Sequence, residues 1–219
     1  AAVAISLVAL RKGEWSRSCL LDGQLVENIT SYLDSADSPG NPIALGENID
    51  KSFQGSIVLG TGFILTTEAQ RLLKEIPRLS EVIFPYLNGS DLNSNPDQLA
   101  SRWVINFFDW PEEKCQYEYP EAYEIIEARV KPERTRKDEK GNFILRKPLP
   151  QRWWIYADKR PKLYSLIKKL SRVLVIAQVS RTVAFAFVSP RQVLDAKLVV
   201  FPFEQSRYFA VLQSSLHYH

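Results

Sequence analysis

The sequence of 219 residues contains no methionine, two cysteines and two histidines. Cys19 and Cys115 are far apart and follow no metal-ligand spacing. Two cysteines in a chain of this size favour a reducing compartment over a disulfide framework, so we expect a cytoplasmic protein. His217 and His219 form a His-x-His pair with no further ligand near them in the sequence, and we therefore predict no metal site.

The sequence also lacks the common catalytic motifs. It has no Gly-x-Ser-x-Gly, no Cys/His pair and no Asn-Pro-Pro-aromatic tetrapeptide of the kind that holds the target amine in amino-methyltransferases. The acidic pairs Glu112-Glu113 and Asp138-Glu139 lie in charged sequence, where nothing would desolvate a carboxylate. We expect no catalytic residue in this chain.

Long hydrophobic runs are scarce. The apolar run at 1–10 is too short to span a bilayer, and Arg11 and Lys12 follow it, which is the wrong order for a secretory signal. A buried strand is the better interpretation, and we expect no membrane partner. Because the chain begins within such a strand and without methionine, we expect it to be a piece of a longer protein.

The charge is distributed very unevenly along the chain. Residues 1–130 carry 10 Lys/Arg and 19 Asp/Glu, whereas residues 131–172 carry 14 Lys/Arg and 4 Asp/Glu. A basic block of this kind is typical of a nucleic-acid contact, because phosphate neutralisation drives such binding. A solvated basic loop and helix is the other interpretation. The block favours a polyanionic partner.

The remaining composition fits a folded domain. Hydrophobic residues make up 45% of the chain and charged residues 24%, which is enough apolar material for a core. Strand-like and helix-like segments follow one another without strict alternation. This order predicts an α+β fold, a mixed α/β sheet with flanking helices.

Turn and cap residues mark the expected elements. Asp22-Gly23 predicts a hairpin. The segment 53–66 predicts a strand, a turn around Gly60 and Gly62, and a second strand. Asn88-Gly89 predicts a turn. Thr67 with Gln70 predicts a capping box. We expect strands at 81–87, 102–108, 172–180, 182–188 and 197–203. We expect helices at 67–76, 119–131, 160–170 and after 206.

The loop rich in Ser, Asp, Pro and Gly around 35–50 suggests a boundary. We therefore expect 1–34 to be the end and exit of an upstream domain, 35–50 a linker, and 51–219 the main domain.

The basic block provides the first set of candidate DNA contacts. Arginine and lysine pair with phosphates, and arginine can also bind guanine through two hydrogen bonds. Adjacent aromatics in a strand cannot both face one core, so either Trp153 or Trp154 is a candidate for stacking on a base. Shielding of one tryptophan by a neighbouring cation is the alternative. The candidates are Lys131, Arg134, Arg136, Lys137, Arg146, Lys147, Arg152 and Trp153.

Three further candidates lie outside the block. Arg181, with Ser180, interrupts two apolar strands and could contact a base or phosphate at their tip, or could simply form a turn. Asn93 offers an amide to base edges or phosphates, and Arg102 stands at a strand entrance. These residues lie where short polar segments join strands, which is also where ordinary turns occur.

Several segments, taken in order, resemble a known family. "AAVAISLVALRKGEW", "SFQGSIVLGTGFILT", "FPYLNGSDLNSNPDQLASRWVINFFDWP", "RVLVIAQVSRTVAFAFV" and "FAVLQSSLHYH", with the basic "VKPERTRK…RWWIYADKRPKLY", are similar to the C-terminal target-recognition region of prokaryotic N6-adenine DNA methyltransferases. The relevant members are the large single-chain enzymes of type II restriction-modification and phage-exclusion systems.

The resemblance implies a module that reads a short duplex DNA sequence. An upstream methyltransferase domain, its intramolecular partner, would flip out the adenine and methylate it with S-adenosylmethionine, so this chain itself would hold no cofactor. The alternative is a protein-protein module whose acidic first 130 residues dock a catalytic or nuclease subunit. A stand-alone enzyme acting on a nucleotide is disfavoured by the lack of a catalytic constellation.

Overall fold

The computed structural model describes residues 12–13, 18–30, 34–35, 43 and 45–215. The chain divides into two compact units, Ala1–Glu47 and Asn48–His219. The predicted strand at 1–10 and the His217/His219 pair lie outside the described residues.

The first unit contains a β-hairpin at the predicted place. Strands β1 (Cys19–Leu21) and β2 (Gln24–Val26) pair antiparallel. The two residues between them, Asp22 and Gly23, have φ of 49° and 81°, as a type I′ turn requires. The Asp-Gly prediction is confirmed.

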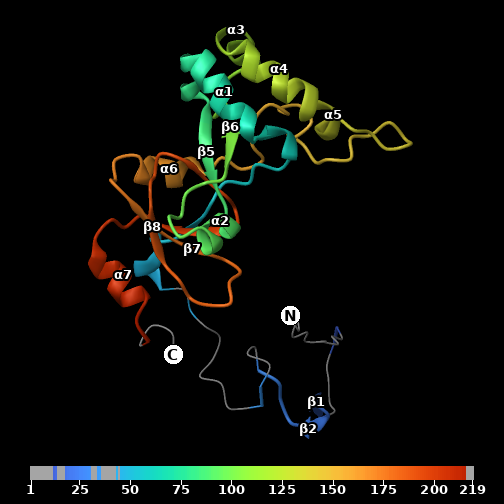
Figure 1. The fold of residues 1–219 in the computed structure, drawn as a ribbon. Coiled ribbons are helices and arrows are strands. Elements are labelled where there is room, and N and C mark those ends of the chain that lie inside the picture. Colours follow the sequence, from blue (N-terminus) through green and yellow to red (C-terminus); the bar gives the residue numbers. More distant parts are fainter. Residues whose placement is uncertain (1–11, 14–17, 31–33, 36–42, 44, 216–219) are drawn as a thin grey trace. The chain divides into compact units, whose positions relative to one another are not determined.

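The second unit is built on two four-stranded sheets (Figure 1). One sheet has the order β4-β6-β5-β9 and the other the order β3-β10-β7-β8. All pairs are antiparallel except β5 with β9. The strands are β3 (Phe53–Gln54), β4 (Ile64–Leu65), β5 (Ile83–Leu87), β6 (Arg102–Ile105), β7 (Val173–Ala177), β8 (Ala186–Val188), β9 (Val193–Leu194) and β10 (Leu198–Phe201).

Helices lie against both sheets, and the fold is mixed α+β, as predicted. Pro120 and Pro161 stand at the first positions of α4 and α6, where the missing N–H costs nothing. The helices are α1 (Thr67–Glu75), α2 (Gly89–Ser94), α3 (Glu112–Glu118), α4 (Pro120–Arg129), α5 (Lys131–Arg134), α6 (Pro161–Ile167) and α7 (Ser206–Leu212), with 3₁₀ turns at Gly46–Asn48, Thr61–Phe63 and Pro77–Glu81.

Two apolar clusters form the core of this unit. The first joins β4, β5 and β6 to α1, α4 and the aromatic segment 153–156. In the second, Val175, Leu198 and Val200 pack against Leu163 and Ile167 of α6. The alternation of side chains along β7 and β10 places these residues on one face of their sheet.

The predicted strand, turn and strand over 53–66 is confirmed as β3, the 3₁₀ turn at Thr61–Phe63 and β4, although the two strands join different sheets. Two local predictions were wrong. Asn88-Gly89 is not a turn, because Asn88 is the N-cap of α2. Helix α1 has no Thr67–Gln70 capping box. Its N-cap is Thr66, whose hydroxyl donates to Glu68 at 2.9 Å instead.

Candidate nucleic-acid interface

The predicted basic segment forms a projecting arm, residues 135–152, which we call the basic arm. Figure 1 shows it extending beyond α5, away from the two sheets. A β-bridge between Lys137 and Phe143 closes it into a hairpin. At the tip, Gly141 has φ of 81°, and Asp138 Oδ1 accepts hydrogen bonds from the N–H groups of Lys140 and Asn142, both at 2.9 Å. The turn chemistry of the sequence therefore shapes the arm.

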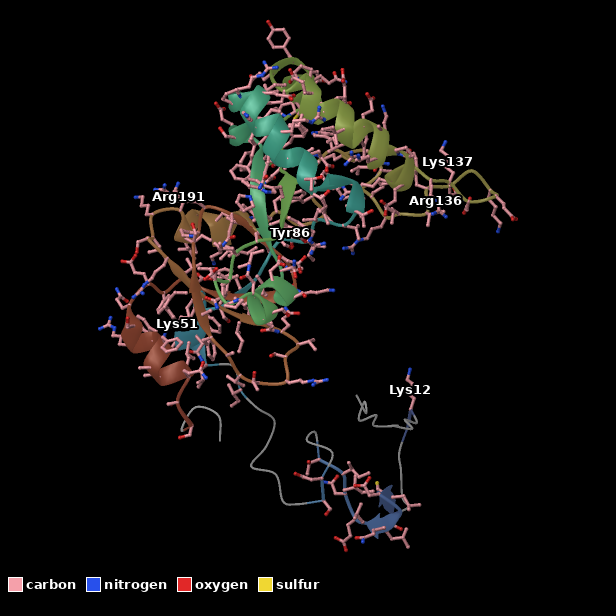
Figure 2. All side chains as sticks on the ribbon, viewed as in Figure 1. Lys12, Lys51, Tyr86, Arg136, Lys137 and Arg191 are labelled. Atoms are coloured by element: carbon pink, nitrogen blue, oxygen red, sulfur yellow. The ribbon has the colours of Figure 1, made fainter. Side chains whose placement is uncertain are left out.

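Four cations of the basic arm are exposed and form no ion pair. Arg136 and Lys137 precede the hairpin tip and are exposed (Figure 2), and Arg146 and Lys147, which follow it, are exposed as well. Among the described residues, none of these four side chains has an ion-pair partner. The arm thus offers a set of uncompensated positive charges, which is the arrangement that phosphate binding requires.

Arg134 does not belong to this exposed set, contrary to its prediction as a DNA contact. Only 1% of it is exposed. Its guanidinium donates to the carbonyl oxygens of Val58 (2.7 Å), Leu59 (2.6 Å), Trp153 (3.3 Å) and Ile155 (2.5 Å). Burial lowers the pKa of Arg134 to about 10. Arg134 therefore joins both ends of the basic arm to the body and has no donor left for a phosphate.

Trp153 and Trp154 are both buried, with 4% and 8% exposure, so neither offers a free face to a base. Trp153 packs on Tyr123 at 5.5 Å between ring centroids, and the Trp154 indole donates to the carbonyl of Trp110 at 3.0 Å. The stacking prediction assumed a strand, in which neighbours face opposite sides. Residues 151–154 form turns instead, and both rings enter the same core.

Two further predicted contacts lie at the base of the arm and are partly neutralised. Lys131 donates to Glu127 at 2.7 Å and lies 5.1 Å from the centroid of the Trp153 ring. Arg152 pairs with Asp109, which also accepts a hydrogen bond from Lys159 at 2.8 Å. These two cations, Lys159 first, hold the pKa of Asp109 below its usual value. The pairing of Lys159 with Asp109 could not be predicted from the sequence, because the two residues are far apart along the chain.

Asn93 and Arg102, two further predicted DNA contacts, lie on other elements than the basic arm. Asn93 is exposed on α2, and Arg102 begins β6 with its guanidinium 5.7 Å from the centroid of the Tyr86 ring. Asp91 on α2 accepts a hydrogen bond from the Ser101 hydroxyl at 2.7 Å, which holds the helix beside the strand entrance.

Arg181 is exposed in the connection between β7 and β8, and α2 packs against β7. The predicted contacts therefore fall into the arm cations and three residues on other elements, namely α2, the start of β6 and the β7–β8 connection.

Other kinds of site are not evident in the part of the chain that the structure describes. Within these residues, no three His, Cys, Asp or Glu side chains gather as metal ligands. No helix among them is long and apolar enough to cross a membrane. Cys115 is buried, and burial raises the pKa of its thiol to about 12, which makes it a poor nucleophile.

Comparison with known proteins gives a likeness in structure only. No family model and no curated protein sequence matches the chain. Its fold is similar to part of a solved restriction-modification enzyme. That enzyme is the Type IIL restriction-modification enzyme MmeI, whose structure was determined in complex with DNA. The likeness has a TM-score of 0.60 at 16% sequence identity and covers 89% of this chain, but only 25% of the MmeI chain.

Proposed function

We propose that this chain is the DNA target-recognition part of a restriction-modification N6-adenine DNA methyltransferase. One observation carries the proposal: the basic arm presents Arg136, Lys137, Arg146 and Lys147 exposed and without ion-pair partners among the described residues. The likeness to part of MmeI, an enzyme solved with DNA, supports the same function.

In this proposal the arm cations bind phosphates, and the three residues outside the arm bind bases. The basic arm grips the phosphate backbone, which supplies affinity without sequence information. Asn93 on α2, Arg102 on β6 and Arg181 in the β7–β8 connection read base edges through amide and guanidinium donors. Arg134 and the two tryptophans hold the arm rather than contact DNA.

Methyl transfer is assigned to an upstream domain of the parent protein. That domain would bind S-adenosylmethionine and receive the extruded adenine. Because extrusion costs a few kcal/mol of unstacking, a firm grip on the flanking duplex is required. We therefore expect this chain to bind duplex DNA whether or not S-adenosylmethionine is present.

The proposal is tested by measuring duplex DNA binding at several salt concentrations. Replacing Arg136 and Lys137 by alanine should weaken binding and reduce the slope of log K against log salt by about 2, since each lost phosphate contact contributes roughly 0.9. The matched control is Arg71→Ala with Lys74→Ala, which removes the same charge from exposed positions of α1. Equal loss in both double variants, or binding independent of salt, would contradict the proposal.

A further inference from the structure

An apolar groove lies on the second unit, outside the groups assigned to DNA. Two adjoining hollows share Phe84 and Arg191. The first, about 470 Å³, lies between α6, the 106–109 loop and the 190–193 segment. The second continues past Phe84 toward α1 and is lined by Leu73, Pro77, Ile83, Pro85 and Trp103 among others. We call the two hollows together the apolar groove.

The floor of the apolar groove is aromatic and partly exposed. Phe84 on β5 meets Phe108 edge to face, with 5.8 Å between ring centroids. Phe108 is 39% exposed and has a φ of 54°, a left-handed conformation that is unfavourable for an aromatic residue. The Asn106 side chain holds it by accepting the Phe108 N–H at 2.9 Å. Strained residues of this kind concentrate at ligand sites.

The rim of the apolar groove is positively charged. Arg191 and Lys168 line it, are exposed and have no ion-pair partner among the described residues. The one carboxylate in the lining, Asp109, is already shared by Arg152 and Lys159. The cations of the rim are therefore available to pair with carboxylates of a bound ligand.

The apolar groove lies apart from the exposed cations of the basic arm. Figure 2 shows Arg191 at one side of the unit and Arg136 and Lys137 on the basic arm at the other. The phenylalanine, proline and valine side chains of the floor suit large apolar side chains of a ligand. This floor favours a polypeptide over a DNA duplex.

We propose that the apolar groove docks an extended acidic segment of a partner protein, with one large apolar side chain in each hollow and carboxylates at Arg191 and Lys168. The two hollows adjoin at Phe84, so each can hold one apolar side chain of the segment. An extended strand directs residues i and i+2 to the same side, and these two residues would fill the two hollows. The cationic rim selects the flanking charges.

The probe is a fluorescein-labelled peptide, Asp-Glu-Leu-Asp-Phe-Glu-Asp, titrated with the full 219-residue chain and followed by fluorescence anisotropy. We expect a Kd of about 10–100 μM, typical of a small interface. Peptides with lysine in place of the acids, or serine in place of Leu and Phe, should bind at least about tenfold more weakly.

Two variants connect the binding to the apolar groove. Arg191→Glu should weaken binding of the acidic peptide at least about tenfold. Lys197 is an exposed cation outside the groove, and Lys197→Glu should leave this binding unchanged. Phe108→Asn removes the ring while supplying a residue that tolerates positive φ, so the loop is retained. It should weaken binding to a similar degree.

Several results would overturn the proposal. These are no binding at about 1 mM, equal binding of the acidic and lysine peptides, or no effect of Arg191→Glu and Phe108→Asn. Concentration-dependent self-association lost in Phe108→Asn would assign the groove to a second copy instead. The Arg136/Lys137 double alanine variant should retain peptide binding, so failure of the DNA proposal is distinguishable from failure of this one.

Discussion

The guanidinium Nη2 of Arg134 lies 2.7 Å from the carbonyl oxygen of Val58. The same side chain reaches Ile155, so one residue connects the start of the basic arm, its end and the strand-turn segment before β4. No carboxylate pairs with this buried charge among the described residues, and its partners are carbonyl dipoles and the Phe63 ring, 5.0 Å away. The basic arm is therefore held at its base although it is exposed along its length.

Replacing Arg134 by methionine should destabilise the protein by roughly 3 kcal/mol, because the buried carbonyls of Val58 and Ile155 lose a charged donor. Urea unfolding measures this difference. Arg136→Met, at an exposed position, should change the stability by less than about 0.5 kcal/mol. Trypsin should also cleave the arm faster in Arg134→Met, and unchanged cleavage would show that Arg134 does not hold the arm.

Asn88→Ala should destabilise the protein by about 1 kcal/mol through loss of an N-cap. Its side-chain oxygen accepts the N–H groups of Ser90 at 2.7 Å and Asp91 at 3.1 Å, and its amide donates to Asp91 at 2.6 Å. Chemical unfolding should detect this loss. Asn93→Ala on the same helix serves as the control and should leave stability unchanged while weakening DNA binding. The reverse pattern would invalidate both assignments.

Stability in acid should depend on the Glu68–Arg129 ion pair, in which the two side chains are 3.0 Å apart. The hydrogen bond from Arg129 lowers the pKa of Glu68 to about 2 from 4.5. A lowered folded-state pKa adds stability above pH 4.5 that is lost as the pH falls through about 2. The difference in thermal midpoint between the natural protein and Glu68→Gln should shrink across this window. Arg129→Gln should give the same pH signature, and a constant difference would refute the coupling.

The two cysteines should differ in reactivity toward a thiol reagent. Cys115 is fully buried, its pKa is raised to about 12, and its thiol donates to the carbonyl of Pro111 at 3.2 Å. Cys19 is partly exposed in the hairpin of the first unit. In the native protein only Cys19 should be labelled, and both should react in denaturant. Rapid labelling of native Cys19→Ser would show that the Cys115 site opens readily.

The sequence predicts those elements that local chemistry determines. Asp22-Gly23 forces a hairpin turn, and Pro120 and Pro161 open helices, because each residue restricts its own backbone. The parallel strand β9 has two residues and gives no periodic signal. Its pairing with β5 depends on a partner far away in the chain, so it could not be expected.

The candidate site was predictable in outline and not residue by residue. Charge counting located the basic arm, and four of its predicted cations are indeed exposed. It could not separate Arg134 from Arg136, because burial depends on carbonyl groups contributed by 58–59 and 153–155. The two tryptophans were misjudged for a related reason, since a turn rather than a strand carries them.

The pairing of β3 with β10 affects how the chain can fold during synthesis. β3 lies near the beginning of the second unit, whereas β10, which stands between β3 and β7, is made near its end. The sheet therefore cannot assemble until almost the whole unit has left the ribosome, and closing so long a loop must precede any gain from the strand pairing. Until then β3 has no partner strand, and the apolar residues that pack on this sheet are exposed in the growing chain, which favours aggregation.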